Sequence, residues 1–247
     1  MGYSARMTVT RASSAALCLG LLACGSSSDD PVDGGVPLDT GVVQECSPDP
    51  ATTFFVTEQG SLSGDLGGLA GADARCASIA VAAGITGKTW VAYLSAENDA
   101  TFGRVDAKDR IGAGPWVNSA GTSIGTNAEI HAGAIPRADI LTECGRRVVY
   151  EASNPTGDRG AHDIFTGSTA EGQLERLVNP STGLRDGPAA TCGDWTSSSP
   201  DDAAMVGHSD HQTADDTWNF AHYTLGCHEA GLRMTAANGR IYCFATD

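Results

Sequence analysis

The pattern of apolar and polar positions along the chain predicts a domain of short strands with one clear helix. Within 72–83 the apolar side chains recur at i, i+3, i+4 and i+7 counted from Cys76, and Gly84 follows as a stop signal. Runs rich in β-branched and aromatic residues predict strands at 52–58, 89–94, 148–150, 163–165, 204–206 and 240–245. Residues 98–145 are rich in Gly, Asn and Thr and are predicted to be mostly loop. These elements predict an α+β domain with long loops.

The first residues carry the pattern of a secretory signal. Arg6 and Arg11 precede an apolar stretch at 15–23, which is too short to span a bilayer as a helix. The segment 21–24 (LLAC) resembles the lipobox of bacterial lipoproteins, in which the cysteine is acylated with groups such as palmitate and becomes the mature N-terminus. The resemblance implies lipidation of Cys24, which anchors a protein to a membrane without a spanning helix.

Beyond the lipobox the composition changes. Residues 24–45 consist mainly of Gly, Ser, Pro and Asp without Lys or Arg, which is typical of a flexible tether with a reach of roughly 25 Å. The chain therefore divides into a lipoprotein signal peptide at 1–23, the lipidated cysteine with its tether at 24–45, and a domain at 46–247. Since Gly25 rather than Asp follows the cysteine, the resemblance implies a place in the bacterial cell envelope, at the outer membrane.

The charge balance narrows the choice of partners. The chain has 15 Lys and Arg against 30 Asp and Glu, so its formal net charge is −15. We therefore expect no binding to nucleic acid, whose phosphates attract basic surfaces. The hydrophobic content of 41% is sufficient for a packed core and excludes a wholly disordered chain.

Six cysteines remain in the predicted domain, because Cys18 leaves with the signal and Cys24 carries the lipid. An even number in an exported chain indicates three disulfides. A metal site is the weaker interpretation, because no two of the six lie at the C-x-x-C spacing of metal-binding motifs. Spacing alone leaves 15 possible connectivities open.

Several segments of the domain, taken in order, resemble one family. They are 63–76 (SGDLGGLAGADARC), 87–95 (GKTWVAYLS), 107–111 (AKDRI), 162–172 (HDIFTGSTAEG), 191–196 (TCGDWT), Cys227 and 240–244 (RIYCF). They resemble the endostatin domain of collagens and the endostatin-like, C-type-lectin-like domains of bacterial lipoproteins, including those of spirochaetes. The resemblance covers about residues 54–245. It implies an α+β, C-type-lectin-like (endostatin-like) domain that is rich in loops and stapled by disulfides.

The resemblance also implies a disulfide pairing. It pairs Cys76 with Cys243 and Cys192 with Cys227, and it leaves Cys46 and Cys144 as a third pair that no family motif supports. It does not imply the zinc or heparin sites of endostatin itself. Residues 46–60 contain no His, and the Arg residues are scattered along an acidic chain.

Residues that could bind a metal ion are concentrated in one acidic segment of the domain, 201–216. The candidate metal ligands there are His208, Asp210, His211, Asp215 and Asp216, and the additional carboxylates are Asp201 and Asp202. The carboxylates suit a calcium ion of the kind that C-type lectins use to bind sugars, and the histidines suit zinc. A solvated acidic loop explains the same residues without any ligand. We therefore expect no resident cofactor, with calcium as the alternative.

The remaining histidines and the tryptophans are predicted to have structural roles. His222 and His228 flank Cys227 and are predicted to pack or hydrogen-bond near its disulfide. The four tryptophans are predicted core residues. We expect no catalytic residues, and the chain has no phosphate-binding glycine motif of the G-x-x-x-x-G-K-[ST] or G-x-G-x-x-G type.

The sequence therefore predicts a lipid-anchored, non-enzymatic recognition protein. Its partners would be the membrane, through the anchor, and a protein or glycan that binds the long loops. The recognition role depends on the fold resemblance alone. The alternatives are a hydrolase or metal-dependent enzyme that uses the His208–Asp216 cluster, and a structural lipoprotein of the envelope.

Overall fold

The computed structural model of the chain describes residues 45–148, 160–210, 213 and 215–247. The signal peptide, Cys24 and the tether predicted from the sequence lie outside these residues, as does His211. Residues 44–247 group into one compact unit by their contacts. In the described part of the chain, no helix combines the length and the apolar character that crossing a bilayer requires.

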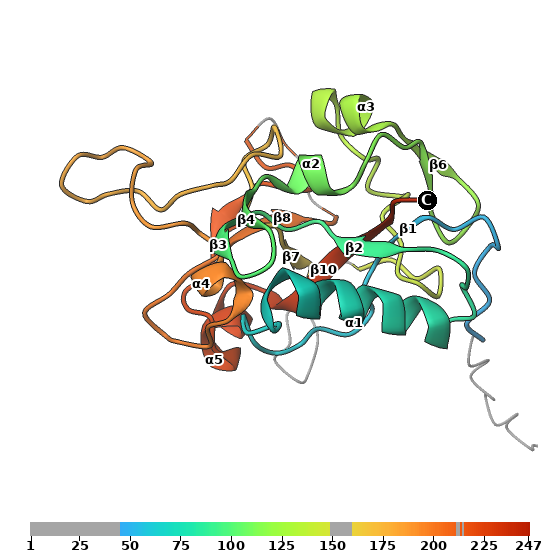
Figure 1. Cartoon of the computed structure of the whole chain (residues 1–247), viewed down its shortest axis with the longest axis horizontal. Helices are drawn as coiled ribbons and strands as arrows, with labels where there is room; N and C mark the ends of the chain where they lie inside the picture. Colours follow the sequence, from blue (N-terminus) through green and yellow to red (C-terminus); the bar gives the residue numbers. More distant parts are fainter. Residues whose placement is uncertain (1–44, 149–159, 211–212, 214) are drawn as a thin grey trace, which may run out of the picture. The chain divides into compact units, whose positions relative to one another are not determined.

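A six-stranded sheet is built around the last strand of the chain (Figure 1). Its strands are β1 (Phe54–Val56), β2 (Trp90–Ala92), β7 (Asp163–Phe165), β8 (Met205–His208), β9 (His222–Tyr223) and β10 (Ala237–Ala245). The C-terminal half of β10 pairs antiparallel with β1 and β2, and its N-terminal half pairs parallel with β7. β8 and β9 continue the sheet from β7, each antiparallel to its neighbour. Strands from the start, middle and end of the domain therefore share one sheet.

Short elements fill the space between these strands. Two ribbons are formed by β3 (Ala96–Asp99) with β4 (Gly103–Val105) and by β5 (Trp116–Val117) with β6 (Ser123–Gly125). The helices are α1 (Gly68–Ala82), α2 (Ala107–Arg110), α3 (Asn127–Ala132), α4 (Cys192–Trp195) and α5 (Glu229–Met234). The prediction that 98–145 is mostly loop is confirmed, although five of these short elements lie wholly within it.

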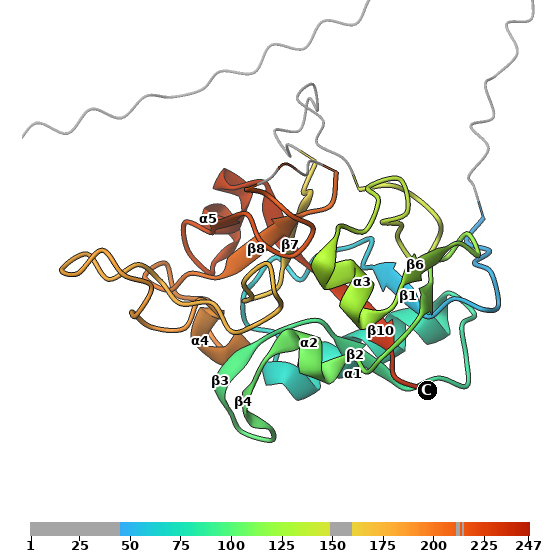
Figure 2. The same cartoon turned by 90° about the horizontal axis from the view of Figure 1, so that it is seen from above.

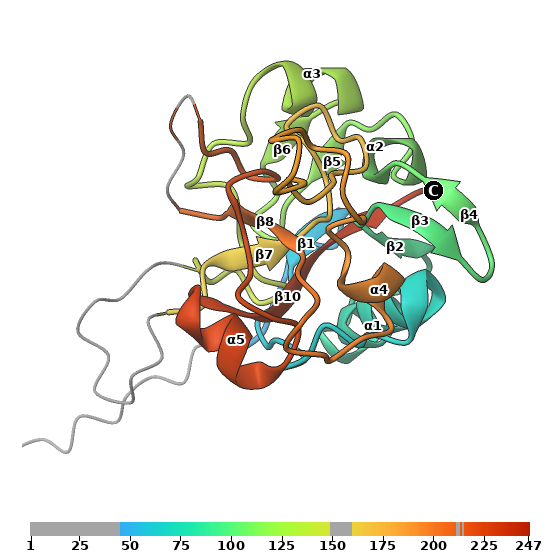
Figure 3. The same ribbon diagram turned by 90° about the vertical axis from the view of Figure 1, so that its left-hand side faces the viewer.

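Successive side chains along each strand point to opposite faces of the sheet, and each face carries an apolar layer. Phe55 and Cys243 belong to the layer that α1 covers, whereas their neighbours Phe54 and Phe244 belong to the opposite layer. Figure 3 shows α1 on one side of the sheet and α2 and α3 on the other. All four tryptophans are buried, as predicted, and their exposed fractions are 4% or less.

The long helix α1 begins earlier than its apolar pattern predicts. The side chain of Asp99, at the end of β3, accepts a hydrogen bond from the backbone N–H of Leu69 at 2.9 Å. This carboxylate caps the first turn from 30 residues further along the chain, so the pattern around Cys76 could not indicate the start. The strands predicted at 52–58, 89–94, 163–165, 204–206 and 240–245 correspond to β1, β2, β7, β8 and β10. Val148 is not in a strand, and 149–150 lie outside the described residues.

Three disulfides fasten this arrangement. They join Cys46 to Cys144, Cys76 to Cys243 and Cys192 to Cys227, with sulfur–sulfur distances of 1.99, 2.00 and 1.96 Å. These are the three pairs expected from the sequence. The second pair ties α1 to β10 across 167 residues and so connects the two sides of one core layer.

Candidate metal centre

Four side chains with metal-binding chemistry meet where β7, β8 and β9 lie side by side. Asp163 opens β7 and His208 closes β8, and the antiparallel register places the two residues opposite each other. His222 opens β9 opposite Val206, which lies two residues before His208, so His208 and His222 share a face of the sheet. His162 directly precedes β7.

The carboxylate of Asp163 is the centre of this group. The Nε2 atoms of His162 and His208 lie 3.4 and 3.3 Å from Asp163 Oδ1. The Nε2 atom of His222 lies 3.2 Å from Asp163 Oδ2. Three imidazoles therefore surround one carboxylate, and we call these four residues the His–Asp cluster.

Asp163 is held in an unusual environment for a charged group. Its side chain has an exposed fraction of 0%, and in the described part of the molecule neither carboxylate oxygen accepts a well-aligned hydrogen bond. Burial of an unmatched carboxylate costs several kcal/mol. The neighbouring imidazoles, or a cation bound with them, would offset this cost.

The pKa values of His222 and His208 shift in opposite directions. Contact with Asp163 raises the pKa of His222, because the carboxylate favours the charged imidazolium. Burial lowers the pKa of His208 and favours its neutral form, which is the form that binds metals.

A second carboxylate, that of Asp210, contacts the ring of His162 and orients it. Asp210 Oδ1 lies 2.6 Å from Nδ1 of His162, so the other ring nitrogen, Nε2, faces Asp163. Metal-binding histidines usually carry such a carboxylate on the ring nitrogen that does not bind the metal.

The spacing of the ligand atoms fits a transition-metal ion. The ligand atoms of His162, Asp163 and His208 all lie within 4.8 Å of one another. A tetrahedral zinc ion with bonds of about 2.0–2.1 Å places neighbouring ligand atoms about 3.3–3.4 Å apart. The contacts of 3.4 and 3.3 Å from His162 and His208 to Asp163 Oδ1 match this value, whereas His222 lies 3.2 Å from the other oxygen, Oδ2, and is not part of that group.

The candidates chosen from the sequence fall into different places. His208 belongs to the cluster and Asp210 supports it, whereas the exposed Asp215 and the partly exposed Asp216 belong to a turn with Thr213. Asp201 and Asp202 form local hydrogen bonds with serines instead. In the described ranges the aspartates of this segment do not form a group of metal ligands.

Sequence reasoning missed three of the four members of the cluster. The sequence predicts only a strand that begins at Asp163, directly after His162. The prediction that His222 lies near the Cys192–Cys227 disulfide is wrong, because β9 turns back to β8 and delivers His222 to Asp163. The sequence signal that could have indicated these ligands was the pair His162 and Asp163 at the point where β7 begins.

Comparisons with known proteins do not identify this site. No protein-family model matches the chain, and no curated protein is significantly similar to it. The functional argument therefore depends on the geometry of the cluster.

Proposed function

We propose that this chain is an exported lipoprotein of the bacterial envelope whose domain binds a divalent transition-metal ion, with zinc as the best fit. The convergence of three imidazole nitrogens on the buried carboxylate of Asp163 carries this proposal. The lipobox resemblance at Cys24 supports the export and the anchor. The disulfide pairs Cys76–Cys243 and Cys192–Cys227 support a C-type-lectin-like, endostatin-like fold.

The donor set favours zinc over calcium. Calcium takes six to eight oxygen ligands, whereas imidazole nitrogen suits zinc, copper, nickel and iron. His162, Asp163 and His208 offer two imidazole nitrogens and one carboxylate, and His222 adds an imidazole at the other oxygen of Asp163; both donor types are zinc ligands. The calcium alternative suggested by the acidic segment is therefore not part of the proposal.

Burial of the cluster supports binding rather than catalysis. The side chains of His162 and His208 are 12% and 11% exposed, and that of Asp163 is fully buried. Only His222, at 42%, presents a large exposed fraction among the four. A bound ion would thus be shielded from a large substrate, in keeping with a non-enzymatic protein.

Isothermal titration calorimetry of the full-length protein in detergent, stripped of metal with a chelator, tests the proposal. We expect one zinc ion per chain, no heat with calcium, and strongly weakened zinc binding in His208→Ala. His228→Ala is the matched control, because it removes an imidazole outside the cluster. Absence of zinc, cobalt, nickel and copper binding would overturn the proposal, as would equal zinc affinities of the two variants.

Protein recognition is a second candidate function, and one feature favours it. The segment 175–190 forms a long arm that projects from the body of the domain (Figure 2). Backbone hydrogen bonds between Leu177 and both Gly187 and Pro188 hold the two sides of the arm together. The arm exposes Val178 and Leu184 by 46% and 62%. Loss of partner capture in a variant with both side chains changed to serine, with zinc binding intact, would separate this role from metal binding.

A further inference from the structure

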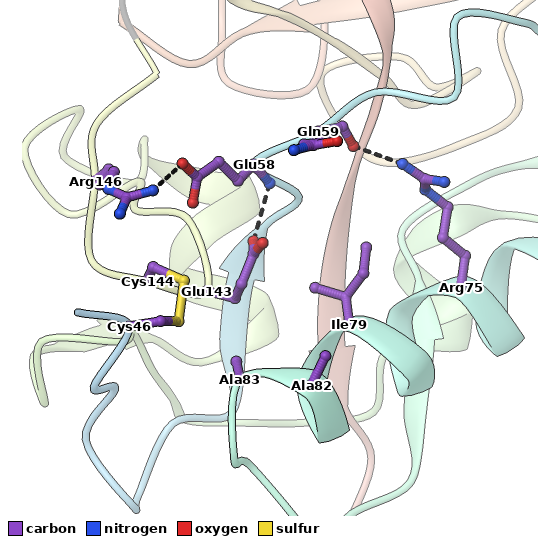
Figure 4. Close-up of a pocket in the computed structure, with 10 residues that line it drawn as sticks. All are labelled: Cys46, Glu58, Gln59, Arg75, Ile79, Ala82, Ala83, Glu143, Cys144 and Arg146. Atoms are coloured by element: carbon purple, nitrogen blue, oxygen red, sulfur yellow. Dashed lines mark hydrogen bonds and ion pairs between the residues drawn. A yellow bond between two sulfur atoms is a disulfide. The ribbon is translucent and has the colours of Figure 1, made fainter. Parts of the chain in front are cut away.

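A cavity of about 480 Å³ lies between α1, the chain just after β1 and the segment around the Cys46–Cys144 disulfide (Figure 4). Its volume falls in the range of small-molecule sites. None of the residues of the His–Asp cluster lines it. The cavity is therefore a second feature to interpret, separate from the metal centre.

One wall of the cavity is apolar. Ile79 and Ala82 of α1 line it together with Ala83, which directly follows the helix, and in Figure 4 the side chain of Ile79 lies between those of Glu143 and Arg75. These small and branched side chains leave room for an aliphatic group and offer it apolar contact.

One side of the cavity carries a positive charge, Arg75, that makes no ion pair at contact distance with the described residues. Arg75 Nη2 donates a hydrogen bond to the backbone oxygen of Gln59 at 2.6 Å. Its Nε–H is buried and has no acceptor, and no carboxylate of the described chain lies within ion-pair distance of this guanidinium. Burial lowers the pKa of Arg75. A buried donor without an acceptor is costly, so the described protein satisfies this guanidinium only in part.

A negative charge faces the same cavity. Glu143 Oε2 accepts a hydrogen bond from the backbone N–H of Glu58 at 2.9 Å, and burial raises the pKa of Glu143. The carboxylate of Glu58 is already paired with Arg146. Glu143 has no such cation within ion-pair distance among the residues described. Cys144 also lies here, but its sulfur is held in the disulfide, so the pair of glutamates does not form a thiolate metal site.

We propose that this cavity binds a free amino acid with an aliphatic side chain. Arg75 donates hydrogen bonds to the ligand's carboxylate, Glu143 accepts hydrogen bonds from its ammonium group, and the wall around Ile79 contacts its side chain. A zwitterion suits the site because it supplies one missing partner to each of two opposite charges that do not pair with each other. A purely anionic or purely cationic ligand would leave one of them unmatched.

Three probes of the same shape separate these contacts. They are L-leucine, 4-methylpentanoate, which lacks the ammonium group, and 3-methylbutylamine, which lacks the carboxylate. Binding to the full-length protein is followed by calorimetry and by the backbone amide resonances of the residues that line the cavity. We expect leucine to bind and each analogue to bind at least tenfold more weakly, because a hydrogen bond to a charged group is lost.

Two variants assign the contacts. Arg75→Met should weaken leucine at least tenfold but leave 3-methylbutylamine unchanged, and Glu143→Gln should weaken leucine but leave 4-methylpentanoate unchanged. Arg75→Lys, which keeps the charge, should restore part of the affinity if the methionine variant folds poorly. Arg104→Met is the matched control, because that guanidinium is exposed and does not line the cavity. The proposal is wrong if leucine leaves the cavity resonances unchanged at millimolar concentration, or if 4-methylpentanoate binds as tightly as leucine.

Discussion

Replacement of Asp163 with asparagine distinguishes a metal centre from a cluster of structural ion pairs. The Asp163 carboxylate is fully buried, with three imidazole nitrogens 3.2–3.4 Å away. If it only holds protonated histidines, Asp163→Asn leaves their charge buried and unmatched, and stability falls by about 3–5 kcal/mol with or without zinc. If it binds a metal, the effect of the substitution depends on zinc.

The size of the zinc effect follows from mass action. At a free zinc concentration 100 times the Kd, the unmodified protein gains about 2.7 kcal/mol, which raises the Tm of a domain of this size by roughly 5–10 °C. A variant that binds zinc 100-fold more weakly gains only about 0.4 kcal/mol at the same concentration. We expect Asp163→Asn to behave like the second case.

Differential scanning calorimetry measures both quantities. The unmodified protein, Asp163→Asn and the control Asp201→Asn, which changes an exposed aspartate, are each heated with a chelator and with zinc. Thiol reductants are left out because they bind zinc and open disulfides. A zinc-induced shift of equal size in the unmodified protein and in Asp163→Asn would refute the metal centre, as would a shift in neither.

Four further changes have outcomes that the structure predicts. Asp210→Asn should weaken zinc binding about 10- to 100-fold in a competition assay with a chromogenic chelator, because the ring of His162 loses the carboxylate that orients it. Replacing both Cys76 and Cys243 with alanine should lower the Tm by roughly 10–20 °C, because a bridge across 167 residues contributes about 5 kcal/mol. Asp99→Ala removes the acceptor of three backbone N–H groups and should cost about 3 kcal/mol in urea denaturation. Glu143→Gln should raise the Tm at pH 7. Burial raises the pKa of this carboxyl, so its ionisation opposes folding, and the gain should vanish as the pH falls below 4.5, its usual value.

Each of these changes has an outcome that contradicts it. Unchanged zinc affinity in Asp210→Asn would show that the His162 ring needs no orientation. If loss of the Cys76–Cys243 disulfide lowered the Tm by only a few degrees, the disulfide would not reduce the conformational entropy of the unfolded chain as expected. Unchanged hydrogen exchange at the start of α1 would argue against the Asp99 cap, and a gain from Glu143→Gln that grows on acidification would reverse the sign of the linkage.

Local sequence patterns were sufficient for five of the strands, β1, β2, β7, β8 and β10, and for most of the long helix α1. Residues 163–165 (DIF) and 240–245 (RIYCFA) have the β-branched and aromatic content of buried strands, and both lie in the central sheet. The short helix α3 also had a readable signal, since Thr126 and Glu129 form a capping box. The prediction of mostly loop at 98–145 did not use this capping box.

Other features depend on contacts that no local pattern contains. In α4, Cys192, Gly193, Asp194 and Trp195 all have positive φ, although only one of them is glycine. Bonds from distant segments hold this turn. Asp194 accepts hydrogen bonds from the backbone N–H groups of 97 and 98, and Trp195 Nε1 donates to the oxygen of Ser95. The disulfide of Cys192 adds a covalent tie, so tertiary structure imposes a conformation that local propensity disfavours.

The His–Asp cluster has the same origin. His208 was recognised because histidine and aspartate are dense around it, but its partners Asp163 and His222 lie 45 residues before it and 14 after it. Only the pairing of β7, β8 and β9 brings them together. Sequence reasoning could therefore indicate one ligand and one supporting carboxylate, but not the residue at the centre.

The disulfides bear on what a metal ion does at this centre. In zinc fingers the metal folds the chain, because such small domains have little other stabilisation. Here three bridges close loops of 35 to 167 residues, and each is worth about 4–5 kcal/mol by chain entropy. That stabilisation offsets the cost of burying Asp163 without a metal, so the domain should fold first and bind zinc afterwards. Circular dichroism of the chelator-treated protein should therefore show native structure at room temperature. An unfolded spectrum that recovers on adding zinc would instead make the ion a folding element.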